Sequence, residues 1–308
     1  STTTLKILTT TQIAAIETTD LKVMSTDQLL SLSSSQVRAL STAQMVELTS
    51  VQLAGLSSAA VAVLTTQQLS ALSDANRNYL DVASIAALGS TQMAGLTTTQ
   101  FAGLSTTAIA ALNTSTVSNL TTAQIAALTT DQALNLTTTT IKALTTKQIA
   151  VLETSDIEQL TSSNIAILSA GQLQALTTSQ VAGLSTQQVF EMNTTTLQAL
   201  TTRQIAALET RDVAVLGTTS IEMLLTTQLQ ALTAAQIGGL TSQQVFDLST
   251  TTLKNLTTTQ IGSIETTDLK VLSTSQLLIL SNAQVQALNT AQVVELTSVQ
   301  LAGLSSAA

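Results

Sequence analysis

The chain has 308 residues, a formal net charge of −8 and 44% hydrophobic residues, and it contains no cysteine, histidine or proline. Without cysteine and histidine, disulfides, thiol nucleophiles and most zinc sites are excluded, and the commonest general base is missing. The ten basic residues are scattered and aromatic residues are scarce. We therefore expect no nucleic-acid partner, because such a partner requires a basic patch.

The apolar residues never form a long uninterrupted run. A membrane-spanning helix needs about 18 to 20 consecutive apolar residues, and Thr, Ser and Gln break the apolar sequence throughout. We expect no membrane insertion. No charged-then-apolar signal pattern stands at the N-terminus, so we expect any targeting segment to lie outside these residues.

An eight-residue repeat runs through the whole chain in constant register. Every residue whose number is a multiple of eight, from Leu8 to Leu304, is Leu, Ile or Met. The position five residues later is apolar in every octad except one, where Arg77 stands. Just before this position, Gln fills 23 of 39 equivalent sites, which gives the consensus L-T-T-x-Q-I-x-A. No linker interrupts the register, so we expect 1–308 to be one continuous array, a segment of a longer repeat protein.

The octad from Leu8 to Ile16 has the pattern of a short helix. Thr9 is a favoured N-cap residue, and Gln12, three residues later, completes a capping box. Leu8 and Ile13 stand at the two positions of a hydrophobic staple. These features predict a helix of roughly two turns, from about Thr10 to Ile16, before Glu17 begins the next repeat.

Successive octads cannot share one continuous helix. Eight residues at about 100° each leave a drift of about 80° per repeat, which would spread the apolar stripe around the cylinder. Because isolated helices of this length are marginal in water, each must pack on its neighbours. We predict an all-α solenoid, right- or left-handed, with one helix of about two turns per octad. The alternative is a β-solenoid, since Thr favours strands, although Leu8 and Ile13 would then point to opposite faces of a strand.

A longer period of 56 residues, or seven octads, is superimposed on the octads. The segments Leu144 to Asp156, Leu200 to Asp212 and Leu256 to Asp268 all read L-x-x-x-Q-I-x-x-[LI]-E-T-x-D. Seven octads fit two superhelical turns of three and a half octads or one turn of seven, and we favour the former. Residues 5–60 also match residues 253–308 at 45 of 56 positions.

Four pairs of carboxylates three residues apart are candidates for calcium ligands or for an acid/base dyad. A calcium ion needs about six to eight oxygen ligands, and no Asp-Gly loop accompanies the pairs. The interpretation that we favour is that each pair lies at the positive N-terminal end of a helix dipole. The pairs are Glu17 with Asp20, Glu153 with Asp156, Glu209 with Asp212, and Glu265 with Asp268.

Two further features depart from the consensus. The octad Ser73 to Leu80, SDANRNYL, carries Arg77 at the apolar position and the single tyrosine, Tyr79. It could form a contact patch or a kink, but we favour simple decay of the repeat. Phe101 occupies a core position, whereas Phe190 and Phe246 stand one residue beyond it. Outward contact points between coils and core filling both remain open for the last two.

The octads resemble the octapeptide arrays of giant bacterial surface and secreted proteins, which are adhesin-like or fibre-forming. The resemblance rests on segments such as LTTAQIAAL from Leu120 and LSTAQMVEL from Leu40, and it covers the whole chain. It implies an extracellular or cell-surface location and a role as a fibre or spacer. It implies no site residues.

We therefore expect a structural repeat protein that forms an elongated solenoid, most simply the body of an extracellular filament or cell-surface fibre. We expect no enzyme activity and no catalytic, cofactor-binding or metal-binding residues. The expected partners are further copies of the chain, bound end to end or laterally, and the exposed Thr and Ser are open to O-glycosylation. The alternative is an adhesin spacer or a Thr lattice that binds ice or polysaccharide, which the variable outward positions disfavour.

Overall fold

The computed structural model describes residues 1–72, 80 and 82–305. Within these residues the regular secondary structure is entirely helical, so the predicted all-α fold is confirmed and the β-solenoid is excluded. The chain divides into two compact units, Ser1–Leu160 and Thr161–Ala308. The octad register passes from one to the other without a change of phase.

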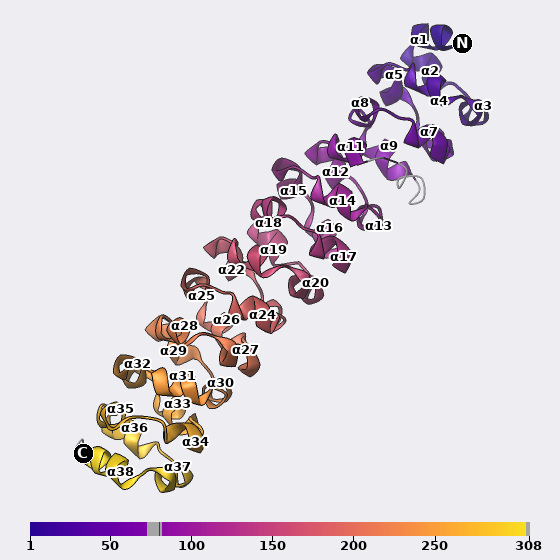
Figure 1. Cartoon of the computed structure of the whole chain (residues 1–308). Helices are drawn as coiled ribbons and strands as arrows, with labels where there is room; N and C mark the ends of the chain where they lie inside the picture. Colours follow the sequence, from indigo (N-terminus) through magenta and orange to yellow (C-terminus); the bar gives the residue numbers. More distant parts are fainter. Residues whose placement is uncertain (73–79, 81, 306–308) are drawn as a thin grey trace. The chain divides into compact units, whose positions relative to one another are not determined.

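The first unit is a succession of short helices, almost one per octad, which follow one another around stacked coils in Figure 1. Their bounds are α1 (Thr2–Ile7), α2 (Thr10–Ala14), α3 (Thr18–Val23), α4 (Thr26–Leu30), α5 (Ser34–Ala39), α6 (Thr42–Glu47), α7 (Ser50–Ala54), α8 (Ser58–Val61), α9 (Thr66–Ala71), α11 (Val82–Ala86), α12 (Ser90–Ala94), α13 (Thr98–Ala102), α14 (Thr106–Ala110), α15 (Thr114–Asn119), α16 (Thr122–Ala126), α17 (Thr130–Leu134), α18 (Thr138–Ala143), α19 (Thr146–Ile149) and α20 (Thr154–Gln159).

The second unit has the same construction. Its helices are α21 (Ser162–Ala166), α22 (Ala170–Ala175), α23 (Thr178–Ala182), α24 (Thr186–Phe190), α25 (Thr194–Ala199), α26 (Thr202–Ala207), α27 (Thr210–Val215), α28 (Thr218–Glu222), α29 (Thr226–Ala231), α30 (Ala234–Gly238), α31 (Ser242–Asp247), α32 (Thr250–Asn255), α33 (Thr258–Ser263), α34 (Thr266–Leu269), α35 (Thr274–Leu278), α36 (Asn282–Gln286), α37 (Thr290–Glu295) and α38 (Ser298–Ser305).

Capping boxes begin most of these helices, as the sequence predicts. In α2 the backbone N–H of Gln12 donates to the Thr9 hydroxyl over 3.3 Å, and the backbone N–H of Thr9 donates to Gln12 Oε1 over 2.9 Å. The N-cap residue is in the extended region, with φ −69° and ψ 159°. This conformation turns the chain sharply between helices, so each octad starts in a new direction.

The helices are shorter than the sequence pattern indicates. α2 ends at Ala14, two residues before the expected end at Ile16, and most helices have only five or six residues. The reason is that the last turn tightens: the N–H of Ile16 donates to the carbonyl of Ile13, three residues back, over 3.2 Å. Such a 3₁₀-type bond closes the helix early and satisfies an end carbonyl.

The core consists of the two apolar positions of each octad. In the coil around α16, Ile125 is 1% exposed and Leu128 is 7% exposed, and the equivalent residues of nearly all other octads are buried as well. Within each unit, most helices pack on the helix three further along the chain, as α2 does on α5, α12 on α15, and α30 on α33. The hydrophobic stabilisation therefore comes from contacts between coils, and a single octad could not supply it.

Small residues before the Leu position allow the coils to approach closely, as their frequency there predicts. A Cβ atom added at Gly239 would lie 2.0 Å from Thr210 Cγ2, and one added at Gly55 would lie 1.9 Å from Thr26 Cγ2. Both contacts join residues 29 apart. At these octads the threonine at the start of one helix lies against the end of a helix in the following coil.

Candidate functional site

The most regular polar feature of the fold is a ladder of buried glutamine side chains, one step of which is Gln148 on α19. Its Oε1 accepts from the backbone N–H of Thr145 over 2.7 Å. Its Nε2 donates to the carbonyls of Val117 and Leu120, 31 and 28 residues earlier, both over 2.8 Å. One amide thus caps its own helix and bonds two backbone carbonyls of the preceding coil.

The second unit repeats this arrangement. Gln204 Nε2 donates to the carbonyls of Leu173 and Leu176 over 2.7 and 2.8 Å, again 31 and 28 residues earlier. Since 28 residues are three and a half octads, the predicted coil of three and a half octads is confirmed. Other glutamines that donate to the carbonyl 28 residues earlier include Gln44, Gln52, Gln68, Gln100, Gln124, Gln228, Gln236, Gln244, Gln260, Gln284 and Gln292.

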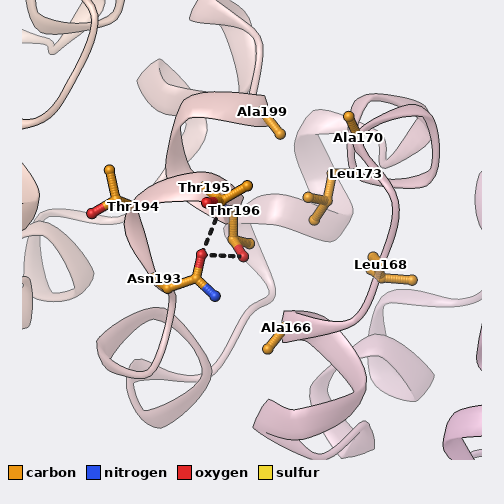
Figure 2. A pocket seen from close by; sticks show the side chains of 9 residues that line it. All are labelled: Ala166, Leu168, Ala170, Leu173, Asn193, Thr194, Thr195, Thr196 and Ala199. Atoms are coloured by element: carbon orange, nitrogen blue, oxygen red, sulfur yellow. Dashed lines mark hydrogen bonds between the residues drawn. The ribbon is translucent and has the colours of Figure 1, made fainter.

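The ladder is interrupted where another residue replaces glutamine. Thr196, at the third residue of α25, is one such position: its hydroxyl donates to Asn193 Oδ1 over 3.2 Å. A cavity of about 440 Å³ lies beside it, between α22 and α25, lined by Leu168, Ala170, Thr194, Ala199 and neighbouring residues. Figure 2 shows Asn193 bonded to its own helix start while the alanines and leucines of the other wall stand apart from it.

The chemistry of this cavity is limited. None of the nine residues that line it carries an ionisable side chain, and threonine, asparagine, alanine and leucine make up the whole lining. The cavity therefore offers hydroxyl and amide groups for hydrogen bonding, but no general base stands beside these hydroxyls to activate one as a nucleophile.

The four acidic octads place their aspartates at the glutamine position of the ladder. Asp20 is exposed in the first coil, whereas Asp156, Asp212 and Asp268 are 2%, 0% and 5% exposed. The preceding glutamates occupy the N-cap position, as predicted, but their side chains make no cap hydrogen bond. The dipole interpretation thus gives the place of these pairs correctly, but it does not foresee that the aspartates are buried between coils.

Two of the buried aspartates have side-chain partners. Asp212 Oδ1 accepts from the Thr186 hydroxyl over 3.1 Å and lies 3.7 Å from Arg211 Nε, which also contacts Glu209 Oε2 at 2.8 Å. Asp268 Oδ1 accepts from the Ser242 hydroxyl. Burial raises the pKa of the Asp212 carboxyl, and the Thr186 hydroxyl and the Arg211 guanidinium oppose that rise.

The carboxyl of Asp156 also has a raised pKa. Burial and the charge of nearby Glu153 raise its pKa from 3.8 to about 6, although a backbone hydrogen bond from Glu153 lowers it in part. Its Oδ2 atom is buried without a hydrogen-bond partner. Among residues 1–72, 80 and 82–305, no three acidic side chains gather in a group that could hold a metal ion.

The phenylalanines divide as their octad positions indicate. Phe101 is fully buried in the core, whereas Phe190 and Phe246 are 58% and 54% exposed. Of the two interpretations left open for the last pair, core filling is wrong and the outward orientation is confirmed. Arg77 and Tyr79 lie outside the residues that the structure describes.

The surface carries few long-range interactions between charges. Lys22 Nζ lies 3.2 Å from Glu47 Oε2, and Lys270 pairs with Glu295 in the same way near the other end of the chain. Both pairs are solvent-exposed, so each contributes little to stability. No helix in the described part of the chain is both long enough and apolar enough to cross a membrane.

Regular short helices in stacked coils, joined by a buried amide ladder, define a helical repeat protein. Four segments of the chain, residues 13–50, 149–186, 205–242 and 261–298, match the model of the ALTTAQ repeat family and together make up just under half of its length. Each match places an acidic octad at the same point, starting with Glu17, Glu153, Glu209 or Glu265. A search of curated proteins finds no match.

Proposed function

We propose that the chain is a structural protein, the body of an extracellular filament or cell-surface fibre, with no enzyme activity. The observation that carries this proposal is the glutamine ladder. Within each unit, buried amides such as those of Gln148 and Gln204 bond the backbone of the coil before them. Because the same contact serves every added coil, a ladder of this kind extends by repetition and supports a long, stiff body.

The outer surface supports a structural role over a Thr-lattice binding role. A periodic ligand such as ice would require one flat face of identical residues. The position three residues after each Leu is exposed in octads throughout the chain, yet its residue type varies freely. Examples are Thr11, Asp27, Ala43, Val51, Gln67, Lys147 and Arg203.

The proposed partner is a second copy of the chain, bound end to end. Val23 and Ile7 are 81% and 78% exposed, whereas valines at the same octad position in later coils are only partly exposed. At the other end, the core-position residues Val293 and Leu301 are 39% and 40% exposed. Each end thus presents an apolar face of the kind that a further coil would cover.

Sedimentation velocity and negative-stain electron microscopy of the 308-residue chain test this proposal. We expect association that grows with concentration and threads of uniform width, since a head-to-tail contact repeats without closing. Val23→Lys should weaken association because it places a charge on the end face. Val51→Lys, at an outward-facing valine that is 69% exposed, should not weaken it.

Two outcomes contradict the proposal. A monomer at all concentrations would exclude the end-to-end contact, and association lost only in Val51→Lys would make the contact lateral. The extracellular location is tested separately, by immunogold labelling of intact cells that produce the protein. Labelling confined to the cell interior would exclude the fibre.

A further inference from the structure

Asp156 stands where the ladder requires a hydrogen-bond donor. It is the third residue of α20, which packs on α17, and the residues 28 and 31 before it are Leu128 and Ile125. At Gln148, one octad earlier, the residues at these spacings are the two whose carbonyls receive the amide Nε2. An ionised carboxylate has only acceptor atoms, so it cannot make these bonds.

Both groups that would take part in the missing bond lack a partner. Asp156 is 2% exposed and its Oδ2 atom has no hydrogen bond. The carbonyl of Leu128 also accepts no hydrogen bond from any residue that the structure describes. The carbonyl of Leu120, by contrast, accepts one from the amide of Gln148. Two buried acceptors on adjacent coils are costly unless a donor comes between them.

We propose that Asp156 forms a protonation-dependent hydrogen bond between two coils of the first unit. When protonated, its carboxyl donates to the Leu128 carbonyl and does what a ladder glutamine does. When ionised, it leaves two acceptors opposed and the contact between α17 and α20 weakens.

The charges around Asp156 favour the proton. Its own octad carries Glu153 and Glu158, and α17 carries the exposed Asp131, so the charged groups of these two helices are all acidic. At the equivalent position of the second unit, Arg211 compensates Asp212 from within the same octad. Here the residue at that place is Ser155, which brings no positive charge.

The direction of the pH effect follows from the raised pKa of about 6 in the folded chain, compared with 3.8 for an ordinary Asp. Between these values the folded state binds the proton and the unfolded state does not. The stabilising contribution is therefore fully present below about pH 4, falls as the pH rises, and is absent above about pH 6 to 7. A shift of about two pKa units corresponds to roughly a 100-fold change in the opening equilibrium of this contact.

Hydrogen exchange of the whole chain, followed by mass spectrometry between pH 4.5 and 7.5, tests whether this hydrogen bond depends on protonation. After correction for intrinsic exchange rates, protection of α17 and α20 should fall as the pH rises. Asp156→Asn keeps the shape and supplies a permanent donor, so it should remove the pH dependence and raise protection at pH 7.5 toward the acid value. Asp156→Gln should do the same by restoring a ladder residue.

Asp20→Asn is the matched control, because Asp20 has the same place in an acidic octad but is exposed. It should leave the pH profile of α17 and α20 unchanged. Carbon-13 titration of the Asp156 carboxyl gives a reading that does not depend on folding stability. A midpoint near 4, or an unchanged profile in Asp156→Asn, would overturn the proposal. The proposal would also be overturned if Ca²⁺ restored protection at pH 7.5 in the wild type alone, since a metal ion and not a proton would then join the two coils.

Discussion

At the scale of single residues, glutamine is the side chain that fits the third helical position best. Its Oε1 accepts from the cap N–H of its own helix, and its Nε2 remains free to donate elsewhere. In the stacked coils this second group meets the carbonyls 28 and 31 residues earlier, as at Gln204. The capping role is predictable from the spacing of Thr and Gln. The second role is not predictable from that spacing, because it depends on where the backbone carbonyls of the neighbouring coil lie in space.

Replacing Gln148 by Ala should therefore cost more than a lost cap. It removes the capping interaction and leaves the buried Leu120 carbonyl without its donor, and we expect a local loss of about 2 to 4 kcal/mol. Gln12→Ala is the matched control, since the hydrogen bonds of the Gln12 side chain in the structure all belong to its own capping box, and it should cost about 1 kcal/mol or less. Native-state hydrogen exchange of the two regions measures both. Equal costs would mean that the bond between coils contributes nothing.

At the scale of the helix, the N-cap largely decides where each element begins. Most helix starts are predicted correctly from Ser, Thr or Asn at the cap position, as with Thr9 before α2, whereas Glu17 and Gly89 are examples of other N-cap residues. The helix ends are less predictable, because the apolar residue at each multiple of eight fits both a helical turn and the extended link that follows it. The structure resolves this ambiguity toward the link, where Leu40, for example, has φ −62° and ψ 133°.

Leu225 offers a direct test of the cap contribution. It is the N-cap residue of α29 and is 49% exposed. Its apolar side chain cannot accept a hydrogen bond from the unpaired backbone N–H groups of the first helical turn. Leu225→Thr should supply the missing acceptor and stabilise the local structure by about 1 kcal/mol. Thr233→Ala at the start of α30 should destabilise by a similar amount, because there the Gln236 N–H loses its 3.2 Å bond to the hydroxyl. Urea titrations of the two variants should shift in opposite directions, and a Leu225→Thr variant less stable than the wild type would contradict the capping argument.

At the scale of the whole chain, the register of 28 residues matters more than composition. A residue pair such as Gln132 and Leu104, joined over 2.7 Å, is in contact only because three and a half complete octads separate its members. The 56-residue period of the sequence indicates this number in advance, since two coils restore the same octad position. Sequence alone could not show which aspartates would be buried, because Asp20 and Asp156 share one motif, yet Asp20 is exposed and Asp156 is buried.

Deleting Thr129 tests whether register holds the coils together. Every later residue would shift by one, so a pair such as Gln132 and Leu104 would be 27 residues apart and the ladder bonds across the junction would fail. Pairs that lie wholly on one side would keep their spacing of 28. In a structure stabilised by nearest-neighbour contacts, the damage should stay within about one coil of the deletion.

We expect limited proteolysis to cut near residue 128 and to release two resistant fragments, whereas Thr129→Ala should remain intact because it costs only about 1 kcal/mol. Digestion of the deletion variant along its whole length would show instead that the coils fold as one cooperative unit, and the nearest-neighbour account would be wrong.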